Sequence, residues 1–177
     1  MVNIHAIETA CNDGRISPGI ETVIAIVAIC GVLTIPTPAD YDPAAPDPVQ
    51  PHTITADIGL KAGYHFTEFH FRKKEATYSA QVAGEEDAEF VNATLNFYIP
   101  KISPLTTLNA NNVLNNRYLV LFKDRVNDDY RVMGEIGNGA SIKFTEQTNP
   151  KNGYQVTIEA QELDDYPAYY TGAVPTE

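Results

Sequence analysis

Apolar and polar side chains alternate along much of the chain after His52, and this period of two constrains the fold more than any other feature. Successive side chains of a β-strand point to opposite faces, so the pattern predicts half-buried strands. It is clearest at 88–99, which follows 75–82 across an acidic tip at 84–87 and so predicts a hairpin. Further strands are predicted at 53–58, 64–72, 118–123, 130–134, 140–145 and 154–160. The chain is therefore expected to be mainly β (α+β), an antiparallel β-sandwich or half-barrel.

The most apolar stretch is a run at 23–35 that contains no charged residue. At about 13 residues it is too short for a membrane-spanning helix, which needs roughly 20. The run is rich in valine and isoleucine and is interrupted by Gly31, which is typical of a strand buried on both faces. It therefore predicts a core strand and argues against a membrane span.

One flanking α-helix is predicted at about 103–116. Ser103 is a favourable N-cap, and Pro104 is a favourable first helical residue. Leu105, Leu108 and Val113 are expected to share one broad face, although the asparagines in this segment are poor helix formers.

A proline-rich segment, PTPADYDPAAPDPVQP, occupies 36–51 and contains six prolines. Proline at this density forms neither a helix nor a sheet ladder, and it stiffens the chain toward an extended conformation. Two interpretations stay open: an arm that lies on a neighbouring surface, or a mobile loop. The rest of the chain fits one domain that spans 1–177, including this arm.

The charge balance is acidic, with 23 aspartates and glutamates against 12 lysines and arginines, a formal net charge of -11. This charge argues against groove-type nucleic-acid binding and against docking on an anionic membrane. A well-solvated surface is the simpler explanation. The two cysteines, Cys11 and Cys30, make neither a disulfide framework nor a zinc pattern. The N-terminal segment does not resemble a signal peptide, so we expect a reducing cytoplasmic environment.

Candidate chemistry is sparse. Glu68 and His70 would share one strand face and could meet a third metal ligand, whereas His65 would point to the other face. Ordinary strand residues are the simpler explanation. The segment 124–129 lacks the oxygen spacing and the glycine of a calcium loop. Because no catalytic or nucleotide-binding motif is present, we expect no enzyme activity, no metal and no cofactor.

Three segments together resemble phage tail proteins of the kind found in Bacteroidetes phages and prophages. They are CNDGRISPGIETVIAI, RYLVLFKDRVNDDYRVMGEIGNGASIKF and NGYQVTIEAQELDDYPAYY. The resemblance implies a tail tube or tail-ring protein, a structural virion protein without a cofactor. Such proteins form homo-oligomeric rings, hexameric by resemblance, whose sheets join between subunits into a continuous inner barrel. Other tail proteins would be partners, and the subunits would assemble in the bacterial host cytoplasm.

The resemblance also suggests where contacts would lie. The apolar run is expected to be buried in both a core and a subunit interface. Possible subunit contacts are Ile24, Ile26, Pro36, Tyr41, Pro46 and Val49. Acidic residues at the lumen or rim would repel the DNA that passes through without specific binding. The candidates are Glu85, Glu86, Asp87, Asp128 and Asp129.

Two alternatives are retained. A tail terminator or a head-tail connector ring would differ from a tube subunit in copy number per particle. A ligand- or carbohydrate-binding β-sandwich would instead need exposed aromatic side chains. Its candidate aromatics are either Tyr64, Phe66, Phe69 and Phe71 or the terminal Tyr166, Tyr169 and Tyr170.

Overall fold

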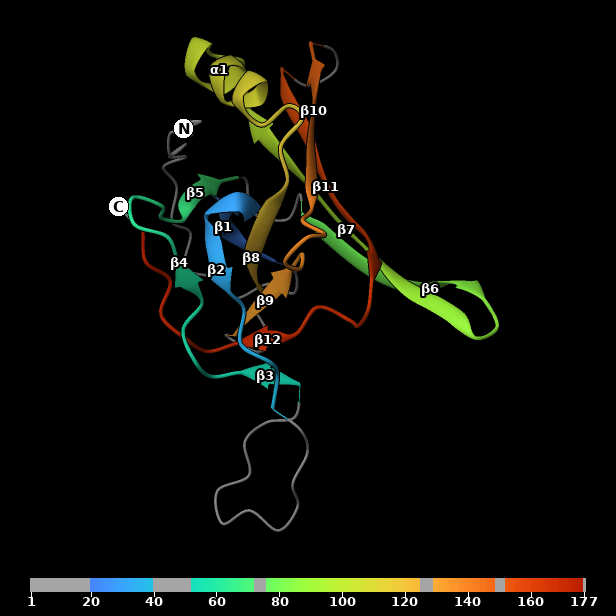
Figure 1. The fold of residues 1–177 in the computed structure, drawn as a ribbon. Coiled ribbons are helices and arrows are strands. Elements are labelled where there is room, and N and C mark those ends of the chain that lie inside the picture. The colour runs from blue at the N-terminus through green and yellow to red at the C-terminus, as the bar shows by residue number, and fades with distance from the viewer. Residues whose placement is uncertain (1–19, 40–51, 72–75, 125–128, 149–151, 177) are drawn as a thin grey trace.

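A computed structural model describes residues 20–39, 52–71, 76–124, 129–148 and 152–176 (Figure 1). The described chain is mainly β with one α-helix, as the sequence predicts. Two larger sheets form the body, and a two-stranded sheet lies beside them. The mainly β prediction is therefore confirmed.

The six-stranded sheet has neighbouring strands that are antiparallel except for β3 and β12, which are parallel. Its order is β3 (Thr53–Ile54), β12 (Tyr169–Tyr170), β9 (Tyr130–Met133), β8 (Tyr118–Asp124), β1 (Ile20–Ala28) and β5 (Thr67–His70).

The four-stranded sheet is antiparallel throughout. Its order is β10 (Ser141–Gln147), β11 (Gly153–Leu163), β7 (Ala88–Pro100) and β6 (Thr77–Glu85). The small sheet pairs β2 (Val32–Thr34) with β4 (Gly59–Leu60).

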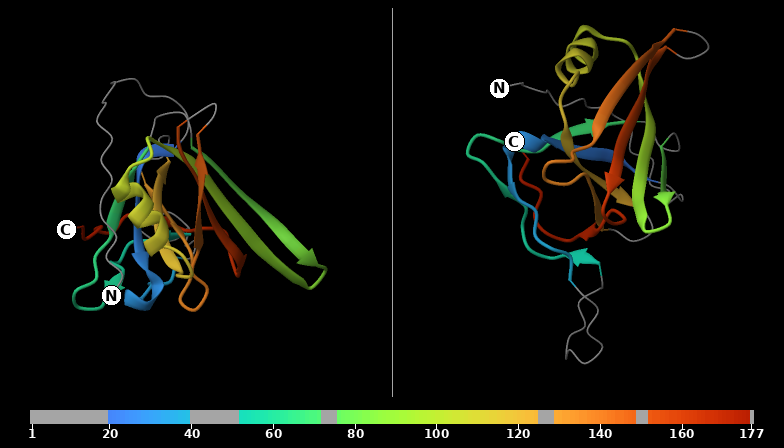
Figure 2. Two further views of the ribbon diagram at one scale, coloured as in Figure 1. Left: turned by 90° about the horizontal axis from the view of Figure 1, so that it is seen from above. Right: turned by 45° about the vertical axis from the view of Figure 1, so that its right-hand side comes forward.

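The main core lies between the two larger sheets (Figure 2). The four-stranded sheet contributes Leu95, Phe97, Val156 and Ile158, and the alternation of the sequence places them on one face. Burial of each such side chain contributes about 1.5–3 kcal/mol, so this face anchors one sheet on the other. The facing side chains of the six-stranded sheet are Ile24, Ile26, Phe69, Tyr118, Val120, Phe122 and Met133.

A second apolar cluster covers the other face of the six-stranded sheet. Ala25 and Val27 of β1 point into it, between the Ile24 and Ile26 side chains that enter the main core. The covering residues come from distant segments outside this sheet and include Val32, Ile58, Phe66 and Ala168. Strand β1 is therefore buried on both faces within one chain.

This double burial corrects the expectation that Ile24 and Ile26 contact another subunit. Each is 1% exposed. The second layer that the apolar run requires is supplied by the chain itself, and no neighbour is needed to cover it.

The apolar run does not continue as one strand. After β1 it passes through a single 3-10 turn, η1 (Ile29–Gly31), and then enters β2. A Cβ at Gly31 would overlap the ring of Tyr64, so only glycine fits this close approach.

The helix α1 (Pro104–Asn112) begins where the sequence predicts. Ser103 Oγ accepts a hydrogen bond from the Thr106 amide at 3.2 Å, which caps the helix. However, the three apolar side chains of the predicted face are not all buried. Leu105 and Leu108 are 44% and 46% exposed, whereas Thr106 and Asn109 are buried.

The rotation of α1 follows from its polar contacts. The Thr107 hydroxyl lies 2.8 Å from the Tyr154 hydroxyl of β11, and Thr107 also donates to the Ser103 carbonyl at 3.0 Å. Val113, at the C-cap, is buried in the main core as predicted. These contacts turn the two leucines toward solvent.

The β6–β7 hairpin extends away from the packed sheets (Figures 1 and 2). Gly84 and Asp87 have positive φ angles of 109° and 73° and turn the chain at the tip. Near the tip, the side of the hairpin that faces the core elsewhere is no longer covered, so Val82 is 48% exposed.

Candidate assembly surface

The four-stranded sheet ends in two open edges. In the part of the chain that the structure describes, no further strand pairs with the outer side of β6 or β10. Ala140, just before β10, exchanges hydrogen bonds of 2.9 and 2.8 Å with Tyr118, so the edge opens only from Ser141 onward. An unpaired edge is a template for adding another strand.

Strand β6 lacks the devices that normally block such pairing. Its sequence, TYSAQVAGE, carries no proline and no charge before Glu85. Natural edge strands are often protected by lysine, proline or a bulge. The edge is therefore typical of a strand that pairs with another chain.

The two edges are compatible with each other. The four strands alternate in direction, so β6 of one copy can add to β10 of the next and remain antiparallel. The midpoint of β6, Gln81, lies opposite Asn92 of β7. The midpoint of β10, Phe144, pairs with Val156 of β11, which in turn pairs with Phe97 of β7. Phe97 lies five positions after Asn92 along β7.

This stagger contributes to the tilt of a sheet continued in that way. Three interstrand spacings separate β6 from β10 within one chain, so the offset of five residues corresponds to about 49°, at roughly 3.3 Å per residue and 4.8 Å between strands. Closed barrels have tilts of about 35–45°. The sheet of one chain is thus staggered somewhat more steeply than a closed barrel, and the register at the β6–β10 junction would set the tilt of the continued sheet.

The solvent face of this sheet is polar and nearly uncharged. Among the side chains on this face, Lys143 and Glu159 form the only oppositely charged pair. Their Nζ and Oε2 atoms are 2.6 Å apart. Asn96 accepts a hydrogen bond of 2.8 Å from the Thr157 hydroxyl across β7 and β11. By strand alternation and register, the face includes Thr77, Ser79, Gln81, Asn92, Thr94, Asn96, Ser141, Lys143, Thr145, Gln155, Thr157 and Glu159, together with Phe90, Tyr98 and, at the end toward the hairpin tip, Glu85.

The predicted lumen acids that the structure describes lie on two separate elements. Glu85, Glu86 and Asp87 are exposed at the tip of the β6–β7 hairpin, where Glu85 ends β6. Asp129 is half-buried just before β9, and Asp128 lies outside the described residues. The described acids therefore do not gather at the middle of the four-stranded sheet.

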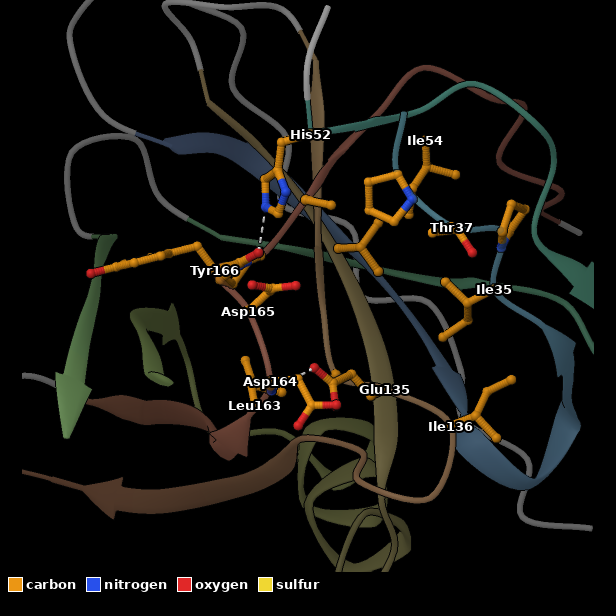
Figure 3. A pocket seen from close by; sticks show the side chains of 16 residues that line it. Ile35, Thr37, His52, Ile54, Glu135, Ile136, Leu163, Asp164, Asp165 and Tyr166 are labelled. Atoms are coloured by element: carbon orange, nitrogen blue, oxygen red, sulfur yellow. Dashed lines mark hydrogen bonds between the residues drawn. The ribbon is translucent and has the colours of Figure 1, made fainter. Parts of the chain in front are cut away.

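A pocket of about 440 Å³ opens beside the six-stranded sheet (Figure 3). Pro36, one of the predicted contact residues, lies in its wall. The lining comes from four separate segments, 35–38, 52–54, 132–136 and 163–168, so no local sequence pattern indicates it. The other predicted contacts, Tyr41, Pro46 and Val49, lie outside the described residues.

Titratable groups lie on one side of the pocket (Figure 3). The Glu135 carboxylate accepts a hydrogen bond of 3.1 Å from the Asp164 amide. Burial raises the pKa of Glu135 above its ordinary value of 4.5, and the nearby Asp164 and Asp165 carboxylates raise it further. His52 Nε2 lies 2.6 Å from the Tyr166 carbonyl, a separation at which the ring N–H donates.

The other candidate ligands do not make a centre. His70 Nε2 lies 3.5 Å from Glu68 Oε2 on β5. Among the described residues, no group of three or more histidine, cysteine, aspartate or glutamate side chains could hold a metal ion.

The aromatic platform needed for a carbohydrate-binding surface is not exposed. Phe66, Phe69, Phe71 and Tyr170 are all buried, in one or other of the two apolar clusters. Tyr166 is exposed beside the pocket, but it lies apart from the buried rings. Each of the two candidate sets of aromatics therefore includes buried rings.

Several exposed apolar side chains were not expected from the sequence. They are Leu33, Val82, Leu105, Leu108, Leu114, Ile136 and Tyr166. Leu105 and Leu108 lie on one helix, and Ile136 and Tyr166 both line the pocket. Grouped exposed apolar side chains mark contact sites more often than single ones do.

Within the described ranges, no helix combines the length and apolar character needed to cross a membrane. Comparisons with models of known protein families, with characterised proteins and with solved structures found no match.

Proposed function

We propose that the chain is a structural subunit of a phage tail tube that forms rings by pairing β6 of one copy with β10 of the next. The observation that carries this function is the pair of open, oppositely directed and staggered edges on one four-stranded sheet. Heterologous contacts of this kind generate closed rings when the rotation between copies closes. The resemblance to phage tail proteins, which rests on short motifs, points to the same assembly.

Only one face of the sheet can line the bore of such a ring. The other face is covered by the six-stranded sheet and forms the main core. The hydroxyl and amide face would therefore surround the lumen. Its lone cation, Lys143, is paired with Glu159, so DNA phosphates meet no free cluster of positive charge. DNA would slide past a polar, uncharged wall, and the acidic surface would keep it from binding outside the bore.

The direct test is negative-stain electron microscopy of the full chain at increasing concentration. We expect stacked rings or tubes with a stain-filled lumen. Single closed rings that never stack would favour a terminator or connector ring. A protein that stays monomeric at every concentration and salt level would contradict both.

A further inference from the structure

We propose that the tip of the β6–β7 hairpin of one copy packs on the exposed face of α1 of a second copy in the next ring. This contact presupposes the tail tube proposed above and describes how its rings stack. It assigns one occupant, another copy of this chain, to an otherwise unpartnered helix face.

The two surfaces lie at opposite ends of one strand. Strand β7 begins at the hairpin tip with Ala88 and ends at Pro100, just before the cap of α1 (Figure 1). A strand of that length spans about 43 Å at roughly 3.3 Å per residue. Copies stacked head to tail along this direction therefore bring the tip of one against α1 of the next.

Both surfaces carry exposed apolar side chains. Leu105 and Leu108 are separated by three residues on α1, so they lie on one side of the helix. Val82 is exposed on the hairpin, three residues before the first residue of the tip acids. Each surface is too small to be an interface alone, but each supplies an apolar centre that the other can cover.

The charges of the two surfaces are complementary. Four exposed acids lie at the hairpin tip, at Glu85, Glu86, Asp87 and Glu89. The helix itself contains no charged residue, and basic residues flank it at Lys101 and Arg117. Lys101 is exposed and is held by a backbone φ of 72° in the turn between β7 and α1. An acidic partner is therefore favoured at α1, and the chain carries one at the far end of the same strand.

The test compares Leu108→Asp with Leu33→Asp, a change at a leucine of similar exposure on β2. We expect Leu108→Asp to form single rings and to raise the concentration needed for stacking at least roughly tenfold, the effect of one lost contact residue. Leu33→Asp should stack as the unaltered chain does. Because both side chains are exposed, circular dichroism and melting should show that both variants fold.

A charge exchange tests the identity of the occupant. Glu86→Lys and Lys101→Glu should each weaken stacking, and the two changes in one chain should restore it. Recovery would require that these positions meet between copies. If Leu108→Asp and both charge variants stack normally, the contact is wrong, although ring formation would still stand.

If the unaltered chain forms no rings, the tail-tube function fails and the stacking contact fails with it. If it forms rings and tubes but only Leu33→Asp disrupts stacking, the tube remains and a different surface joins the rings. These outcomes distinguish the assembly from the contact proposed here.

Discussion

At the scale of single residues, the ionisation of Glu135 in the pocket wall changes the stability of the folded protein. Its raised pKa, caused first by burial, means that the folded protein holds its proton more tightly than the unfolded chain does. Glu135 therefore favours folding least after it has lost that proton. Its contribution falls as the pH rises above 4.5, the ordinary value, and through the raised value in the folded state.

Replacing Glu135 with glutamine should remove this dependence. The glutamine oxygen can still accept the Asp164 amide, but it does not ionise. We expect the melting temperature of Glu135→Gln, relative to the unaltered chain, to increase between about pH 4 and pH 7. Thermal melts in matched buffers would measure it. A difference that stays constant or decreases with pH would contradict the prediction.

Single residues also show where sequence reasoning fails. The sequence places the two leucines of α1 on one broad face with Val113, but of the three only Val113 is buried. The contact between the Thr107 and Tyr154 hydroxyls orients the helix, and Tyr154 lies in a strand far along the chain. A tertiary contact of this kind leaves no trace in the periodicity of the helix.

At the scale of elements, strands are predicted well where one face is buried and the other is wet. The alternation at 88–99 became β7, and the predicted hairpin across 84–87 is present. The apolar run was correctly interpreted as doubly buried, but its second layer was assigned to another subunit. The actual cover comes from Val32 in the three-residue strand β2 and from Ile58 and Phe66 outside the sheet, segments too brief to show a period.

The edge of β6 makes the most direct prediction about an element. The substitutions Ser79→Lys and Gln81→Lys would add side chains that project from the polar face, so the fold should remain intact. They would lie near Lys143 of an adjoining copy, and lysine on an edge opposes strand addition. We expect the doubly substituted chain to remain monomeric where the unaltered chain forms rings, as measured by analytical ultracentrifugation.

The matched control is Gln161→Lys, which adds charge to the exposed end of β11 inside the sheet. It should assemble normally. Equal loss of assembly in the edge variant and this control would indicate a general charge effect and would argue against pairing through β6.

At the scale of the whole molecule, the acidic net charge and the polar sheet face have separate roles. The sequence suggested that carboxylates line the bore, but the acids at the hairpin tip are away from the middle of the sheet face. The net charge of -11 repels DNA from the protein as a whole. The sheet face contributes almost none of this charge, because its Lys143 is paired with Glu159. Which acids belong to which surface depends on the fold, and composition could not reveal it.

This separation predicts how assembled rings treat DNA. We expect no measurable binding of duplex DNA at physiological salt, because few phosphate-neutralising cations are available. Glu159→Lys would give each copy two unpaired lysines on the polar face and should produce salt-sensitive retention of DNA. Fluorescence anisotropy with labelled DNA would measure both, and equal binding by the two proteins would argue against this face as the bore.

The stagger between β6 and β10 has one more consequence. Because the register within every copy is the same, one repeated register at the β6–β10 junction would give the strands the same inclination however many copies close the ring. The width of the channel is linked to this inclination, because the diameter of a closed sheet depends on the number of strands and on their tilt. Residues that shift the pairing at the junction would therefore change the slope of the strands and the calibre of the tube together.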